Sequence, residues 1–208
     1  MCGIDTIRSR VADGRQPFRE DEGMNRIYIW RLRMATRERL CGRLHEPDIV
    51  ETALEAEMSA HDSLREELYQ LMFDADARVS ENAAWIFSHF GKKGNLWLQD
   101  RQDALIHEVM GARSATKRRL ILSILRKQHF EKETINTAFL DYCLEQILSP
   151  GQPVGIRSLC IYLAYEQCVY YPELLAELET TLRQLSRESL TPGLRHAQRQ
   201  TLGKIRLA

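Results

Sequence analysis

The chain has 208 residues, of which 44% are hydrophobic and 28% are charged, and its 29 basic side chains balance 29 acidic ones. This composition excludes an intrinsically disordered chain, and the neutral charge argues against a protein built mainly to coat nucleic acid. No apolar run approaches the ~20 residues that a membrane-spanning helix needs, and the N-terminus lacks the apolar segment of a secretory signal, so we expect a cytoplasmic protein with no membrane partner.

The five cysteines are odd in number and irregularly spaced, and no two of them form a CxxC pair. This pattern argues against a disulfide framework and against a zinc site. Cys143 and Cys160 fall in apolar helical stretches, where cysteine behaves as a small hydrophobic residue. We therefore expect reduced thiols in the core, no metal and no cofactor.

Residues 1–23 are polar and include Gly14, Pro17, Gly23 and an acidic cluster, so we predict a flexible tail followed by one helical domain over residues 24–208. From Met24 to Leu44 an apolar stripe predicts a helix with arginines on its other faces. We interpret it as a capping helix with a solvated cationic face, and a nucleic-acid-binding arm is the alternative. Pro47 and Asp48 suit the first turn of a further helix that runs to Met58.

A leucine-rich helix follows His61, and the acidic turn Asp74–Asp76 leads into a second helix that ends at Phe90. The second helix has its apolar residues on one face: Val79, Ala83, Ile86, Phe87 and Phe90. The next five residues, GKKGN at Gly91–Asn95, hold two glycines and predict the end of the helix. No strand precedes this segment, so it is not a phosphate-binding loop.

The same two-helix unit then recurs, and no segment shows the alternation of a β-strand, which predicts an all-α chain. The further pairs are Asp100–Met110 with Thr116–Gln128, Thr134–Leu148 with Val154–Cys168, and Pro172–Leu185 with Gly193–Ile205.

Equivalent positions near the start of the second helices recur at a nearly constant interval. Val79, Lys117, Ile156 and Leu194 are 38, 39 and 38 residues apart, close to the period of HEAT and armadillo repeats. The segment LREELYQLMFDADARVSENAAWIFSHF resembles the HEAT motif. The resemblance implies a right-handed α-α superhelix of about four helical pairs plus the N-terminal capping helix.

The resemblance also implies pairing between a turn aspartate and an arginine early in a neighbouring second helix. Asp74 and Asp76 match the acidic position. The basic position is matched by Arg118, Arg157 and Arg195. Later turns lack the aspartate, so a continuous ladder is not expected, but these arginines have a structural role that competes with ligand binding.

The second helices of stacked pairs tend to line a concave surface that binds extended partners. Shifting Trp85 by the repeat interval gives Ser123, Tyr162 and Gln200, and shifting His89 gives Lys127, Glu166 and Lys204; none of these residues is aliphatic. We predict a groove for a protein or peptide, lined by Asn82, Trp85, His89, Arg126, Lys127, Tyr162, Tyr165 and Glu166. In the alternative interpretation, Trp85 completes the core and the charged residues form an ordinary solvated face.

The basic residues 117–119, with Arg126 and Lys127, are interpreted as solvated or paired between repeats, and a phosphate-binding patch is the alternative. The six histidines are scattered, and neither HExxH nor GxSxG occurs. We therefore expect a non-enzymatic interaction scaffold. The alternative is a nucleic-acid-binding protein similar to DNA alkylation-repair glycosylases in repeat architecture and size, from which we carry over no catalytic residue.

Overall fold

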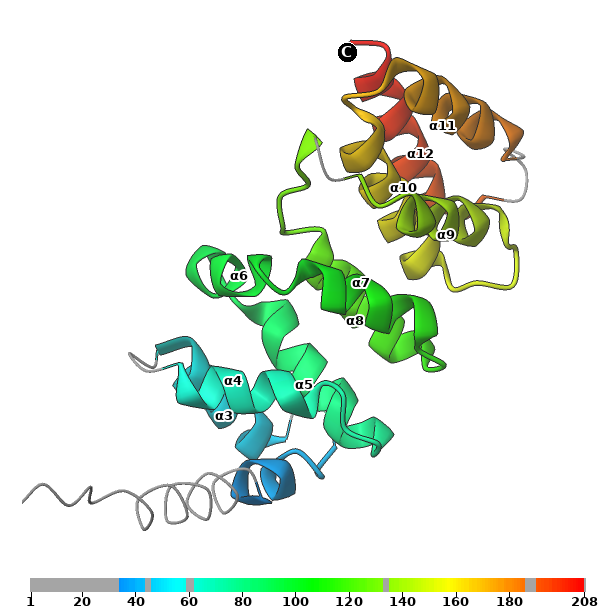
Figure 1. Ribbon diagram of the computed structural model, residues 1–208. Helices are drawn as coiled ribbons and strands as arrows, with labels where there is room; N and C mark the ends of the chain where they lie inside the picture. Colours follow the sequence, from blue (N-terminus) through cyan, green and yellow to red (C-terminus); the bar gives the residue numbers. More distant parts are fainter. Residues whose placement is uncertain (1–33, 44–45, 59–61, 133–134, 186–189, 208) are drawn as a thin grey trace, which may run out of the picture.

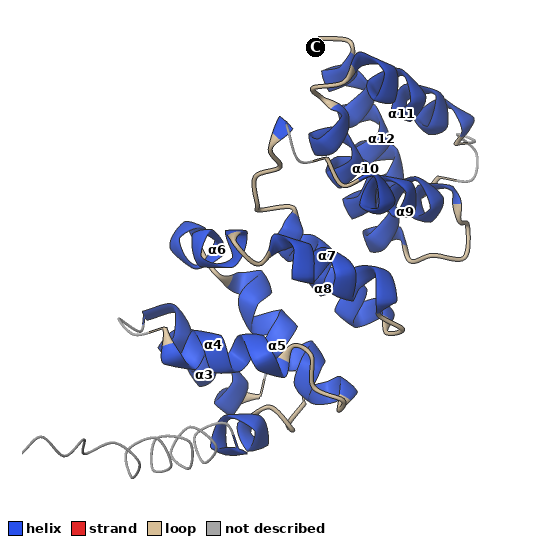
Figure 2. Cartoon of the chain, in the orientation of Figure 1, coloured by secondary structure: helices blue, strands red, loops and turns tan. Residues whose placement is uncertain are grey.

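The computed structural model describes residues 34–43, 46–58, 62–132, 135–185 and 190–207, and within these ranges the chain forms helices and no strand (Figure 2). Residues 34–39 are helical. The helices that follow are α3 (Pro47–Met58), α4 (Ser63–Leu71), α5 (Ala77–His89), α6 (Lys92–Gln99), α7 (Gln102–Gly111), α8 (Ala115–Leu125), α9 (Thr137–Leu148), α10 (Val154–Cys168), α11 (Pro172–Gln184) and α12 (Pro192–Ile205). The all-α prediction is confirmed.

The helices form antiparallel pairs that stack one after another along an elongated array (Figure 1). The pairs are α4 with α5, α7 with α8, α9 with α10, and α11 with α12. The second helix of each pair also packs against the next second helix, so α5, α8, α10 and α12 make a continuous layer. This is the helical repeat solenoid that the sequence interval predicts.

Side-chain caps set the starts of three of the four second helices. The Asp76 carboxylate accepts from the backbone N–H groups of Arg78 and Val79 at the start of α5. Ser114 caps α8 and Thr191 caps α12 in the same way. Each cap satisfies a backbone donor that has no partner inside the helix, which fixes where the helix begins.

The apolar stripe of α5 is the centre of its part of the core, as predicted. Val79, Ala83, Ile86 and Phe87 are fully buried. The Phe87 ring stacks on Trp97 of α6, with centroids 6.0 Å apart. Cys143 of α9 and Cys160 of α10, predicted as core thiols, are free and buried, as is Cys168 of α10, whereas Cys41 is free and exposed.

The prediction that Gly91–Asn95 ends the helix is confirmed, but the sequence did not predict that the same segment begins another helix. α5 does end at His89, but Gly91 is then the N-cap of α6. The Glu57 carboxylate of α3 accepts the Gly91 backbone N–H at 2.8 Å, and Leu98 of α6 is fully buried. These contacts with distant residues stabilise a short helix that Gly94 would disfavour in isolation.

The arginines of the second helices have structural partners, although not the predicted turn aspartates. Arg157 Nε donates to the Ile147 carbonyl oxygen at 3.0 Å, and Arg118 Nη1 donates to Gln146 Oε1 at 3.3 Å. Arg195 Nη2 donates to the Leu190 carbonyl oxygen at 3.1 Å.

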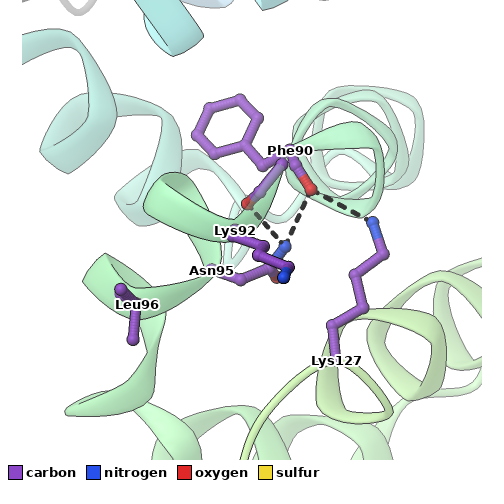
Figure 3. Close-up of a pocket in the computed structure, with 6 residues that line it drawn as sticks. Phe90, Lys92, Asn95, Leu96 and Lys127 are labelled. Atoms are coloured by element: carbon purple, nitrogen blue, oxygen red, sulfur yellow. Dashed lines mark hydrogen bonds between the residues drawn. The ribbon is translucent and has the colours of Figure 1, made fainter.

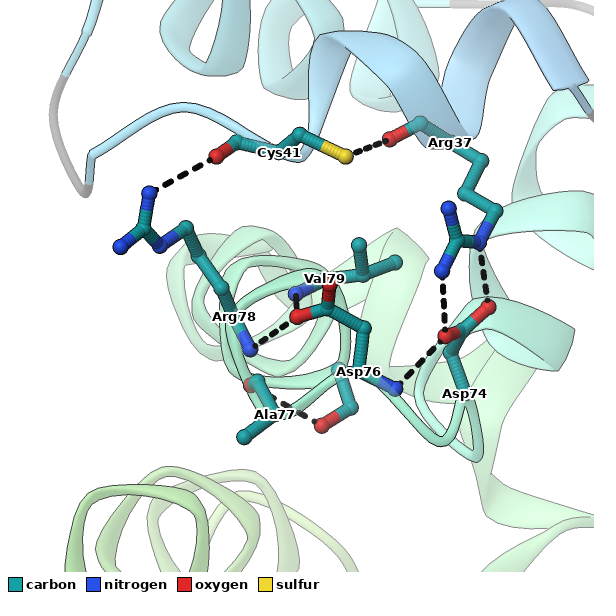
Figure 4. A network of polar contacts seen from close by, with 8 residues as sticks. Arg37, Cys41, Asp74, Asp76, Ala77, Arg78 and Val79 are labelled. Atoms are coloured by element: carbon teal, nitrogen blue, oxygen red, sulfur yellow. Dashed lines mark hydrogen bonds and ion pairs between the residues drawn. The ribbon is translucent and has the colours of Figure 1, made fainter.

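Asp74 instead accepts two hydrogen bonds from Arg37, at 2.9 and 3.1 Å, and Asp76 is used as a cap (Figure 4). This pairing ties the turn before α5 to the helix at residues 34–39. It also raises the pKa of the Arg37 guanidinium, through its hydrogen bond to Asp74 and the Asp74 charge.

Replacing Gly94 with alanine is expected to lower the free energy of unfolding by about 1–3 kcal/mol. A Cβ atom at this position would lie 2.3 Å from Cδ2 and 2.8 Å from Cγ of Phe90, whose side chain is only 2% exposed and has little room to move. Urea denaturation provides the measurement. In Gly203→Ala the new Cβ meets nothing within 4 Å, so this control is expected to gain about 0.5–1 kcal/mol. Equal gains in both variants would contradict the tight packing of Phe90 on α6.

Several sequence predictions fall outside the described residues: the tail at 1–23 and the first part of the capping helix, up to residue 33. None of the helices described here combines the length and apolar character needed to cross a membrane. Among the same residues, no three His, Cys, Asp or Glu side chains come together as a set that could hold a metal ion.

Candidate interaction site on the second helices

Asn82 was predicted to line a groove, and the structure contradicts this. Its side chain is 1% exposed, and its Nδ2 donates to the carbonyl oxygens of Leu40 at 2.8 Å and Gly42 at 3.0 Å. Asn82 therefore holds the chain that leaves the N-terminal helix against α5. A partner cannot reach it, because a segment 40 residues earlier in the chain covers this part of α5.

Trp85 lies in the core, as in the alternative interpretation, and not on an open groove surface. Its side chain is 9% exposed and belongs to the cluster of buried apolar residues. The His89 ring lies over it, with centroids 4.2 Å apart, and His89 Nδ1 is 2.8 Å from the Trp85 carbonyl oxygen. His89 itself is exposed, so at this end of the predicted stripe only the imidazole is available to a partner.

Lys127 connects the end of α8 to the end of α5. Its Nζ donates to the carbonyl oxygens of Ser88 at 2.5 Å and Phe90 at 3.2 Å. An ammonium group is favourable there, since the last carbonyls of a helix carry partial negative charge. Partial burial lowers the pKa of Lys127, and the Glu57 charge acts in the opposite direction. The sequence interval makes Lys127 the equivalent of His89 in the next repeat, and Lys127 Nζ contacts the carbonyl oxygens of the residues on either side of His89.

Two cation–aromatic contacts connect the next second helices. The Arg126 guanidinium lies over the Tyr162 ring, 3.6 Å from its centroid, and so joins α8 to α10. Lys204 of α12 lies 4.8 Å from the centroid of Tyr165, and its Nζ is 3.8 Å from Glu166 Oε1. Such contacts contribute about 0.5–1 kcal/mol at exposed sites.

The predicted residues that remain accessible, together with Lys204, thus follow the layer of second helices from α5 to α12. We call them the second-helix strip: His89, Arg126, Lys127, Tyr162, Tyr165, Glu166 and Lys204. The tyrosines are half-buried and the charged ends are exposed. Apart from His89, three cations oppose one carboxylate in the strip, so the strip is net positive.

A pocket of about 610 Å³ adjoins the strip where α5, α6 and the end of α8 meet (Figure 3). It is lined by Phe90, Gly91, Lys92, Asn95, Leu96 and Lys127. Leu96 is 71% exposed at its edge. Asn95 Nδ2 donates to the carbonyl oxygens of Phe90 and Gly91, at 2.7 and 2.9 Å, and so holds the turn that shapes the pocket.

Of the pocket residues, sequence reasoning singled out only Lys127 as a binding residue. The sequence interpretation treats Gly91–Asn95 as a helix terminator and Phe90 as part of an apolar core face, so it gives neither a binding role. One signal could have found them: the apolar run Leu96-Trp97-Leu98 directly after this segment is too hydrophobic for an ordinary surface loop.

No curated protein and no solved structure matches the chain. A comparison with known protein families matches residues 36–205 to the HEAT repeat domain. The matched span begins in the helix that carries Arg37 and ends at the last residue of α12, so it includes all four helical pairs. The chain belongs to the HEAT repeat family.

Proposed function

We propose that this protein is a non-enzymatic scaffold that binds a protein or peptide along the second-helix strip. The observation that carries the proposal is the pair of cation–aromatic contacts, Arg126 on Tyr162 and Lys204 on Tyr165, which join successive repeats on an exposed surface. Arginine and tyrosine, together with tryptophan, are enriched among the few residues that dominate binding energy at protein interfaces.

The arrangement also reduces the entropic cost of binding. Arg126 and Lys204 have long side chains that would otherwise sample many rotamers, and the aromatic rings already hold them in place. Side chains that are ordered before binding lose less conformational entropy when a partner arrives. Because the helices are stacked in a row, the strip suits an extended segment that crosses several repeats.

Site-specific photo-crosslinking in cells that express the protein tests this proposal. A photoreactive amino acid replaces Tyr162 in one version and Ala104, an exposed residue of the first helix α7, in the matched control. We expect one recurrent protein to be crosslinked from position 162 and not from position 104. The added change Arg126→Glu should reduce this crosslink severalfold, with circular dichroism confirming an intact fold. Equal crosslinking from both positions would contradict the proposal.

Because the strip carries a net positive charge, binding of nucleic acid is the competing outcome. Titration with duplex DNA at low and high salt separates the two, because phosphate contacts give a steep loss of affinity with added salt. Absence of DNA binding at low salt is the expected result. Tight, strongly salt-dependent binding that Arg126→Glu weakens would replace the protein-scaffold proposal with a nucleic-acid one.

A further inference from the structure

We infer that the pocket between α5, α6 and α8 binds a large apolar side chain of an acidic segment in the partner. This inference rests on the proposed function and names the chemistry of the partner at one end of the strip. Four features of the pocket support it: its fixed walls, its exposed apolar edge at Leu96, its lysines and its continuity with the strip.

The walls of the pocket are held by contacts that do not depend on a ligand. The Phe90 carbonyl oxygen accepts from both Asn95 Nδ2 and Lys127 Nζ, at 2.7 and 3.2 Å. The Gly91 N–H donates to Glu57, and Gly94 allows the buried Phe90 ring to pack on α6. A preformed pocket of about 610 Å³ has room for a large side chain without rearrangement.

Leu96 gives the pocket an apolar edge that the folded chain does not use. It is 71% exposed, in contrast to Leu98 two residues later, which is fully buried. An apolar side chain that enters the pocket would cover Leu96 and remove both surfaces from water. Burial of this kind favours binding in proportion to the apolar area that is removed from water.

The charged groups around the pocket favour acidic residues beside the apolar one. Lys92 and Lys127 line it, and Lys93 is exposed on the same first turn of α6. The acidic group that faces them is Glu57. Its carboxylate accepts a hydrogen bond from the Gly91 N–H, and its negative charge attracts the Lys127 ammonium group. Three lysines against one engaged glutamate leave a positive field, which attracts a segment rich in aspartate and glutamate.

The pocket continues the strip, since Lys127 belongs to both and Phe90 directly follows His89. The pocket depends on α6, which lies in the connection between the pairs α4–α5 and α7–α8. The connection between the pairs α9–α10 and α11–α12 consists only of residues 169–171 and contains no such helix. A pocket built at the α5–α8 junction by this additional helix can fix the position of an extended partner along otherwise similar repeats.

Selection of random twelve-residue peptides displayed on phage against the 208-residue chain tests the inference. We expect enriched peptides to carry leucine, phenylalanine or tryptophan flanked by aspartate or glutamate. Their affinity, measured by fluorescence anisotropy, should fall with added salt. No enrichment, or enrichment of basic or uncharged peptides, would overturn the inference.

Two variants test whether the selected peptides bind in the pocket. Leu96→Asp and Lys92→Glu should each weaken binding by at least about tenfold, because one removes the apolar edge and both introduce a charge that repels acidic residues. Leu148→Asp is the matched control: Leu148 is an exposed leucine of α9 outside the pocket, and its replacement should change affinity by less than about twofold. Equal effects of Leu96→Asp and Leu148→Asp would overturn the assignment to this pocket.

Failure of this inference and failure of the proposed function give different results. If the crosslink from position 162 persists in cells while acidic peptides are not selected, the strip binds a partner and the pocket chemistry is wrong. If that crosslink is also absent, the proposed function itself fails.

Discussion

Replacing Trp85 with alanine is expected to lower the free energy of unfolding by about 3–5 kcal/mol, the usual cost of truncating a buried tryptophan. The indole is 9% exposed and belongs to the core formed by α5 and its neighbours. Truncation would leave a cavity in this cluster and would also remove the surface against which the His89 ring lies. Urea denaturation followed by far-ultraviolet circular dichroism provides the measurement.

His89→Ala is the matched control for this experiment. His89 is exposed on the same helix and contacts the same indole ring, so its loss removes one ring contact without opening a cavity. We expect a change within about 0.5–1 kcal/mol. A similarly small effect of Trp85→Ala would contradict the core assignment and would return Trp85 to the set of surface residues.

The second large effect is a loss of stability at alkaline pH. Burial raises the pKa of the Cys168 thiol from 9.0 to about 12, with a smaller contribution from the Glu177 charge. Burial likewise raises the pKa of Tyr142 from 10.0 to about 12 and that of Cys143 well above 9.0. These groups are therefore protonated in the folded chain at pH values where they would ionise in the unfolded chain.

Because their pKa values are higher in the folded state, their contribution to stability is complete below about pH 9 and is lost as the pH rises towards 12. Cys168 alone accounts for a loss of about 2 kcal/mol between pH 7.5 and pH 10.5. Partial burial lowers the pKa of Lys127 and so opposes this trend, but its side chain is exposed and the effect is screened by water. Urea midpoints measured across this pH range test the prediction.

Cys168→Ala provides the comparison for the alkaline effect. The variant starts from a lower stability at pH 7.5, since it loses a buried sulfur atom. Its stability should nevertheless decrease less steeply above pH 9 than that of the unchanged chain. Parallel curves would show that Cys168 does not ionise on unfolding in this range.

Much of the second-helix strip could be predicted from the repeat interval alone. The interval aligned His89 with Lys127, and Glu166 with Lys204. In the structure, Lys127 donates hydrogen bonds to the carbonyl oxygens of the residues on either side of His89, and Lys204 forms an ion pair with Glu166. Helix periodicity decides which residues share a face, and a constant interval repeats that face from one second helix to the next.

Exposure within that face could not be predicted in the same way. Asn82 and Trp85 share the stripe with His89, but Asn82 is covered by the chain at Leu40 and Gly42, and Trp85 belongs to the core. Polar character alone does not reveal burial, because a buried asparagine is stable when distant carbonyl groups accept its hydrogen bonds.

The sequence by itself determined the all-α class, the four helical pairs and the order of the second helices, since these follow from local periodicity, capping residues and a constant interval. Only the tertiary structure decided that Gly91 begins α6, that Phe90 and Leu96 form a pocket with Lys127, and that Asn82 is unavailable. These features depend on Glu57 capping α6, on Lys127 reaching α5, and on the chain at Leu40 covering Asn82. Each joins residues more than 30 positions apart, and helix periodicity describes only neighbours within a few turns.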